Sequence, residues 1–138
     1  MRVALDTNIL VSAFATRGIC TDILNLVLTE HQLTLGETVL EELSRVLRDK
    51  IKVPSQAVAE TIVFLRAQAV VVGPSPKTGF VLRDKDDESV LDEAVAGLAE
   101  VLVTGDRDLL DVAASAPIKI LDPRGFWEEI RSEASAED

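Results

Sequence analysis

The feature that most constrains the fold of this 138-residue chain is a series of short apolar runs separated by helical patterns. The runs are continuous and lack polar/apolar alternation, which is typical of strands buried on both faces of a parallel sheet. Strands that alternate with helices favour a sheet covered by helices on both sides. We therefore predict an α/β protein, a three-layer α/β/α sandwich with a central parallel sheet of about five strands.

The element boundaries follow from the same pattern. Strands are expected at residues 3–5, 33–35, 70–72, 101–103 and 118–121, and helices at 19–31, 38–49, 56–69, 88–98, 109–114 and 124–131. The length fits a single compact domain. We predict one domain over residues 1–131 and a disordered tail over residues 132–138, because this last segment is small, polar and acidic.

Two acidic residues directly follow predicted strands. Asp6 follows the first strand and Asp106 follows the fourth. The carboxyl ends of parallel strands share one edge of the sheet, which is where ligands of such folds bind. Each Asp is also a preferred N-cap for the helix that comes next. Position alone leaves both roles open.

Helical spacing adds a third candidate. In the helix predicted over residues 38–49, Glu42 falls at the border of the apolar stripe, whereas Glu41 points to the opposite side. Glu41 is therefore interpreted as a surface acid, and Glu42 as a residue that can lean toward the sheet edge. On helical geometry alone, a border Glu is more commonly an ordinary surface residue.

The fourth candidate, Asp87, continues the buried stripe of its own helix, together with Leu91 and Ala94. A buried carboxylate needs a partner, which is either the free N–H groups of the first helical turn or a metal ion. Asp86 lies off the stripe and is expected to cap the helix.

Acids that reach one sheet edge indicate a site for a hard cation. Mg²⁺ and Mn²⁺ prefer oxygen ligands and generate a nucleophilic hydroxide without a histidine base. His31 is the only histidine and Cys20 the only cysteine, so neither a zinc site nor most histidine-based hydrolase mechanisms fit. The predicted catalytic and metal-binding residues are Asp6, Glu42, Asp87 and Asp106, with Asn8, Thr104 and Asp108 as supporting groups.

With these residues placed, the chain resembles PIN domains, including the VapC-type toxins of toxin–antitoxin pairs. The likeness runs nearly end to end and is carried by residues 3–10, 42–47, 83–94 and 103–110. It assigns the family's acidic ligands to the same four acids. The resemblance implies a doubly wound sheet, a Mg²⁺- or Mn²⁺-dependent endoribonuclease that cleaves single-stranded RNA, often a homodimer, and an antitoxin protein as partner.

RNA binding would draw on Arg45, one turn from Glu42, and on Arg83 and Arg107 in other edge loops. For Arg45, complementing the C-terminal end of its helix is an equally good explanation. The net charge of −10 is unfavourable for phosphate binding, but bound cations would neutralise the clustered acids locally. The chain has no signal-peptide pattern and no long apolar run, so we expect a cytoplasmic protein without membrane contact.

Two other functions remain as alternatives. A HAD-like phosphatase also has an Asp after its first strand and a late Gly-Asp pair, as in Gly105-Asp106. Asn8 opposes this alternative, because that chemistry needs a second Asp there to transfer a proton. The other alternative is a PIN fold that is catalytically silent and only binds proteins, against which the complete set of acids argues.

Overall fold

The structure, a computed structural model, describes residues 1–137. The strands are β1 (Arg2–Leu5), β2 (Gln32–Gly36), β3 (Val70–Val72), β4 (Val101–Val103) and β5 (Lys119–Leu121). The helices are α1 (Thr7–Ala15), α2 (Ile19–Glu30), α3 (Glu37–Asp49), α4 (Ser55–Gln68), α5 (Lys85–Ala96), α6 (Arg107–Asp111) and α7 (Pro123–Glu137).

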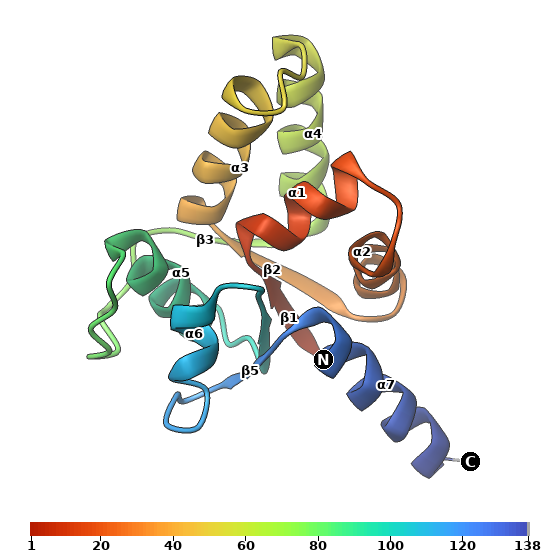
Figure 1. The fold of residues 1–138 in the computed structure, drawn as a ribbon, viewed down its shortest axis with the longest axis vertical. Helices are drawn as coiled ribbons and strands as arrows, with labels where there is room; N and C mark the ends of the chain where they lie inside the picture. Colours follow the sequence, from red (N-terminus) through yellow and green to blue (C-terminus); the bar gives the residue numbers. More distant parts are fainter. Residues whose placement is uncertain (138) are drawn as a thin grey trace.

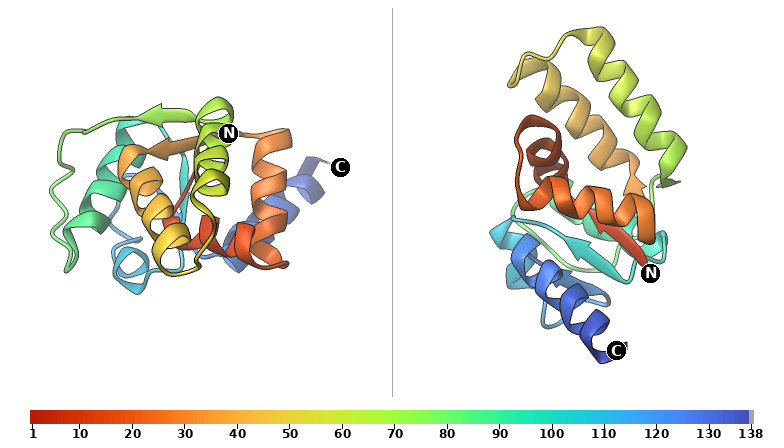
Figure 2. Two further views of the ribbon diagram at one scale, coloured as in Figure 1. Left: turned by 90° about the horizontal axis from the view of Figure 1, so that it is seen from above. Right: turned by 90° about the vertical axis from the view of Figure 1, so that its right-hand side faces the viewer.

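All strand pairs are parallel, and the strand order is β3-β2-β1-β4-β5. The chain moves outward in one direction from β1 to β3, then crosses to β4 and continues to β5. Right-handed crossovers therefore place α1 to α4 on one face of the sheet and α5 and α6 on the other. Figures 1 and 2 show this arrangement, with α3 and α4 standing side by side above the sheet. The predicted three-layer α/β/α sandwich is confirmed.

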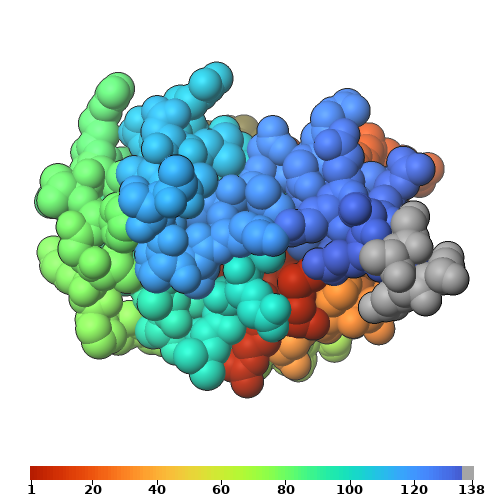
Figure 3. Space-filling view, turned by 90° about the horizontal axis from the view of Figure 1, so that it is seen from below, coloured from red at the N-terminus to blue at the C-terminus, as the bar shows by residue number. Residues whose placement is uncertain are grey.

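The C-terminal helix α7 packs against α2 and β5. In the space-filling view α7 (dark blue) lies against the orange segment that includes α2, in agreement with its packing on α2 and β5 (Figure 3). Phe126 is its fully buried side chain. The helix continues to Glu137, into the acidic segment 132–138 for which we expect disorder. That disorder stays a prediction. Asp138 lies outside the described residues.

One helix was missed by the sequence analysis. α1 begins immediately after β1, because the Asp6 carboxylate accepts a hydrogen bond from the Thr7 N–H at 2.7 Å and caps the helix. Only Asp6 separates the strand from the helix, and no Gly or Pro stands between them, so the change from strand to helical spacing gives little signal in the sequence.

The boundaries of α5 also differ from the prediction. Asp84, and not Asp86, caps its first turn by accepting the Asp86 N–H at 2.9 Å, so the predicted cap at Asp86 is wrong. The helix ends at Ala96, because Leu98 adopts a left-handed conformation (φ 60°). The Leu98 N–H then donates to the Val95 carbonyl, which closes the last turn.

No single helix among residues 1–137 is long and apolar enough to cross a membrane. Together, α1 and α2 pass that test by length and composition, although they are bent by 105°. Core helices pass the same test, and the buried apolar residues of both helices belong to the hydrophobic core.

Candidate metal centre

The centre of the site is built by the two neighbouring strands β1 and β4. Their register pairs Leu5 with Val103, so Asp6 and Thr104 emerge side by side at the carboxyl edge. The buried Thr104 hydroxyl donates to the Asp6 carboxylate at 2.7 Å and accepts the Asp106 N–H at 2.9 Å. One hydroxyl group thus orients both acids that the strand ends predicted.

Capping and clustering are compatible at these positions. Asp6 caps α1, and Asp106 caps α6 by accepting the Asp108 N–H at 2.8 Å. The capping bonds fix the direction of each carboxylate, and the Asp106 Oδ2, which takes no part in capping, is left to face a ligand. The structural role predicted as the alternative is therefore present, and it helps to aim the two side chains.

Three acids come closest together. Asp87, Asp106 and Asp108 each offer a carboxylate oxygen, and these oxygens all lie within 4.8 Å of one another. Oxygens on opposite sides of a Mg²⁺ ion lie about 4.2 Å apart, so the spacing suits a shared cation. Asp108, predicted as a supporting acid, lies inside this group.

The charge of the group is felt most strongly at Asp87. Burial, followed by the negative charges of Asp106 and Asp6, raises the pKa of Asp87 to about 7. The Asp87 carboxyl also lies within hydrogen-bonding reach of the Asp106 side chain. A site that binds a proton this tightly has an excess of negative charge that a cation would neutralise.

Asp6 and Glu42 form the second side of the site. Burial raises the pKa of Asp6 despite its hydrogen bonds to Thr104 and Thr7. Burial also raises the pKa of Glu42, and the Asp6 charge adds to that effect. Glu42 is half-buried and Glu41 is exposed, as the helical spacing predicted. Glu42 is close enough to Asp6 to feel its charge, and it lies outside the group formed by Asp87, Asp106 and Asp108.

The sequence analysis did not single out Thr7. Its hydroxyl is buried without a hydrogen-bond partner among the described residues, yet it is near enough to Glu42 to offset part of the rise in the pKa of that carboxyl. The sequence signal for Thr7 was its place directly after Asp6, in the first turn of the helix that was missed. An unpartnered buried hydroxyl near an acid is a position for a further ligand or water.

Asn8 and Gly105 link the loops that follow the two central strands. A Cβ atom at position 105 would lie 3.2 Å from the Asn8 amide nitrogen, so glycine lets this amide rest on the loop. Asn8 is exposed, and its amide borders the loop that leads to Asp106. The supporting role expected for Asn8 stays a prediction.

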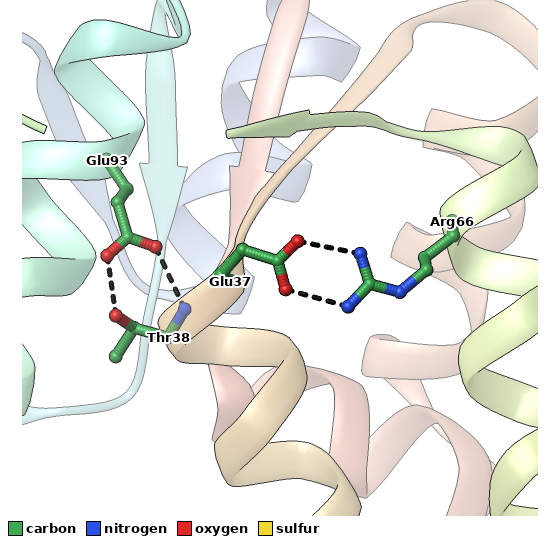
Figure 4. A network of polar contacts seen from close by, with 4 residues as sticks. All are labelled: Glu37, Thr38, Arg66 and Glu93. Atoms are coloured by element: carbon green, nitrogen blue, oxygen red, sulfur yellow. Dashed lines mark hydrogen bonds and ion pairs between the residues drawn. The ribbon is translucent and has the colours of Figure 1, made fainter. Parts of the chain in front are cut away.

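The α3 helix, which carries Glu42, is anchored at its first turn by a residue of α5 (Figure 4). The buried Glu93 carboxylate accepts the Thr38 N–H at 2.9 Å and the Thr38 hydroxyl at 2.5 Å. A Cβ atom at Gly36 would lie 2.0 Å from the Glu93 Oε1, so only glycine leaves room for this bond. The orientation of Glu42 therefore depends on a contact between α3 and α5.

The predicted RNA-binding arginines lie around the cluster. Arg83 is almost fully exposed, with its Nε 4.0 Å from the Asp108 Oδ2. Arg45 is exposed, and its charge offsets a small part of the rise in the pKa of Glu42. Arg107 is exposed in the first turn of α6. Arg45 and Arg83 thus border the acids from two sides.

Comparison with known proteins shows the family to which this chain belongs. A family model described as PIN domain matches residues 2–108, from β1 to the first turn of α6. The chain belongs to the PIN-domain family. All the acids of the site lie within the matched part. No protein with a curated description matches the chain in sequence.

The PIN domain is also similar to two solved structures. A chain of VapBC2 from Rickettsia felis, bound to a DNA fragment from their promoter, has a TM-score of 0.62 and 20% identity, over 88% of this chain and 98% of that one. A chain of VapBC-1 from nontypeable Haemophilus influenzae has a TM-score of 0.65 and 17% identity, over 90% of this chain and 99% of that one. These likenesses confirm the fold.

The donor set of this PIN domain fits a hard divalent cation. Its ligands would be carboxylate oxygens, which Mg²⁺ and Mn²⁺ prefer, and the pKa values of Asp6, Glu42 and Asp87 are all raised. The unpartnered Thr7 hydroxyl adds a free oxygen at the same edge. The histidine and cysteine of the chain lie elsewhere, on α2 or at its end.

Proposed function

We propose that this PIN domain is a Mg²⁺- or Mn²⁺-dependent endoribonuclease that hydrolyses phosphodiester bonds in single-stranded RNA. The observation that carries the proposal is the convergence of Asp87, Asp106 and Asp108 within 4.8 Å, beside the charge of Asp6. Membership in the PIN-domain family supports a nuclease, and it replaces the HAD-like phosphatase as the explanation of an Asp after the first strand.

The proposed ligands are Asp6, Glu42, Asp87 and Asp106, with Asp108 as a further acid of the same group. A bound Mg²⁺ or Mn²⁺ would polarise the scissile phosphate and lower the pKa of an attacking water. Thr104 holds Asp6 and the Asp106 loop in fixed relation, so their carboxylates need little rearrangement.

A histidine base is not available at this edge. His31 ends α2, and its Nδ1 lies 3.3 Å from the amino group of Met1, at the opposite end of β1 from Asp6. Burial and the neighbouring amino group lower the pKa of His31. The carboxylates therefore carry the proposed reaction without imidazole.

We further infer that the enzyme is the toxin of a toxin–antitoxin pair. The similar folds belong to VapBC complexes, and exposed apolar side chains at Phe14, Ile51 and Phe64 offer a partner a surface to cover. Homodimer formation and a cytoplasmic location, where RNA is available, belong to the same proposal.

The deciding experiment is cleavage of a 5′-labelled single-stranded RNA by the purified chain with Mn²⁺ or Mg²⁺. Asp87→Asn and Glu42→Gln are expected to lower the rate about 100-fold or more, because each removes a ligand charge. The matched exposed acids Asp22→Asn and Glu128→Gln should cleave like the wild type.

Equal cleavage by wild type, Asp87→Asn and Glu42→Gln would show that a contaminating nuclease cleaves the RNA, and it would contradict the nuclease proposal. Absent cleavage, with divalent ions still bound, would favour a catalytically silent binding module. Release of phosphate from a small monoester, with RNA untouched, would favour a phosphatase.

A further inference from the structure

A groove lies between α4 and α3, the helix that carries Glu42. It has a volume of about 280 Å³ and is lined by Leu40, Ser44, Arg45, Arg48, Ile62 and Arg66. A second hollow shares Ser44, Arg48 and Ile62 with it and extends toward the start of α4. These two adjoining hollows are here called the α3–α4 groove, after the two helices that rise above the sheet in Figure 1.

The groove concentrates positive charge on a strongly acidic chain. Three arginines face it, and Glu41 is the acid in its lining, in a protein of net charge −10. Residues 45–52 alone contain four Lys or Arg residues and a single acid, Asp49, whose Oδ1 lies 3.0 Å from the Arg48 Nε; a phosphate would compete with this exposed ion pair. Attraction of this kind favours an anionic ligand with repeated charges.

Arg45 connects the groove to the cluster. It follows Glu42 by three positions and precedes Arg48 by three, so on the α3 surface it lies about 60° from each of them. Its charge acts on Glu42, and its side chain also lines the groove. In the part of the chain that the structure describes, Arg45 has no ion-pair partner within 4.0 Å.

Arg66 lies on the other wall, held in place before any ligand arrives. Its two terminal nitrogens each bond one Glu37 carboxylate oxygen at 2.7 Å, as Figure 4 shows. Arg66 also holds the pKa of Glu37 below its usual value. The floor between the walls is apolar, with the fully buried Leu40 and the half-buried Ile62.

We propose that the α3–α4 groove binds the phosphodiester backbone of the RNA strand as it leaves the metal centre. Arg45 and Arg48 would contact successive phosphates, and the apolar floor would accept the face of a base. This inference rests on the proposed nuclease function. Arg45 lines the groove and is also close to Glu42, so a ligand in the groove can extend to the acids of the site. This favours RNA, the proposed substrate of those acids, over an acidic peptide, which the carboxylates would repel.

The test measures binding of a 5′-fluorescent single-stranded RNA by fluorescence anisotropy in the presence of Mg²⁺. The parent protein carries Asp87→Asn, which suppresses cleavage. In this background, Arg45→Gln/Arg48→Gln should weaken binding about tenfold at low salt and reduce the slope of log K against log salt by about 1.4, or 0.7 for each lost phosphate contact. The exposed arginines of α7 provide the control pair, Arg124→Gln/Arg131→Gln, which should bind like the parent.

Calorimetric titration of Mn²⁺ separates this role from damage to the metal centre: Arg45→Gln/Arg48→Gln should not weaken Mn²⁺ binding, because it removes positive charge near Glu42. Unchanged RNA affinity and salt slope in this variant would overturn the groove proposal. The proposal would also be overturned if oligoglutamate bound the parent protein as tightly as RNA does and lost the same affinity in Arg45→Gln/Arg48→Gln. If wild type binds RNA through the two arginines but cleaves nothing, the nuclease proposal fails and the groove proposal stands.

Discussion

Thr104 connects the two strand ends through a single buried hydroxyl. It is fully buried, and its oxygen both donates to Asp6 and accepts from the Asp106 backbone. Replacing the hydroxyl with a methyl group leaves a buried carboxylate oxygen and an N–H group without a partner. Buried polar groups that lose their partner are costly, and acids that lose such support bind metal less tightly.

Thr104→Val should therefore lower the free energy of unfolding by about 1–3 kcal/mol and Mn²⁺ affinity by about 10- to 100-fold. Denaturant unfolding and calorimetric titration measure the two effects. Thr34→Val is the matched control, because the Thr34 hydroxyl is equally buried but has no hydrogen-bond partner among the described residues. Equal unfolding curves for the two variants would contradict the role of Thr104.

The raised pKa of Asp87 predicts how the stability of the metal-free protein depends on pH. Its pKa is about 7 in the folded state, against an ordinary value of 3.8. Between these values the folded state binds the extra proton, so the free energy of unfolding falls as pH rises through this window. Thermal unfolding without metal should thus show a lower melting temperature at pH 8 than at pH 5.5, with a smaller difference in Asp87→Asn.

The same linkage predicts the effect of Mn²⁺. A cation replaces the proton at Asp87, so Mn²⁺ should raise the melting temperature more at pH 8 than at pH 5.5. An equal shift at both pH values would show that the metal does not compete with this proton. Asp22→Asn, on an exposed acid of α2, provides the control for a general charge effect.

At the scale of the elements, α5 holds several parts of the molecule in place. Its most buried acids accept backbone N–H groups of other segments: Glu88 from Leu82, Asp92 from Thr78, and Glu93 from Thr38. The stripe pattern predicted Asp87 as the buried acid of this helix, yet Asp87 is only half-buried. Two sides of α5 are covered, so one apolar stripe could not identify its buried positions.

Glu93 is the clearest test of this role. Glu93→Ala removes the cap of α3 and leaves the Thr38 N–H without its partner, so we expect a loss of about 1–3 kcal/mol in the free energy of unfolding. Glu60→Ala, on an exposed acid of α4, should change it by less than about 0.5 kcal/mol. Similar losses in both variants would mean that Glu93 contributes no more than a surface acid.

For the whole molecule, the proposed boundary after Arg131 can be tested by truncation. Ser132, Glu133 and Ala134 are exposed, whereas Phe126 is fully buried on α7. Removing residues 132–138 should change the free energy of unfolding by less than about 0.5 kcal/mol, while Phe126→Ala should cost about 3–5 kcal/mol. A large loss on truncation would show that the acidic segment belongs to the domain.

Much of the fold could be predicted because its signals are local. A fully buried parallel strand needs a continuous apolar run, and the five predicted runs coincide with the five strands of the described chain. Parallel pairing also places every strand end at one edge, which was enough to select Asp6 and Asp106. Helical spacing separated Glu42 from Glu41, because neighbours on a helix point about 100° apart.

Tertiary structure alone decided how these residues meet. Helical spacing gives a direction only relative to the helix's own axis, whereas the rotation of a helix against the sheet depends on contacts far apart in sequence. The Glu93 cap at Thr38, across 55 positions, sets that rotation for α3. Similar packing brought Asp108 beside Asp87 and left the Thr7 hydroxyl unpartnered. The sequence determined which acids reach the sheet edge, and packing determined which of them lie close enough to share a cation.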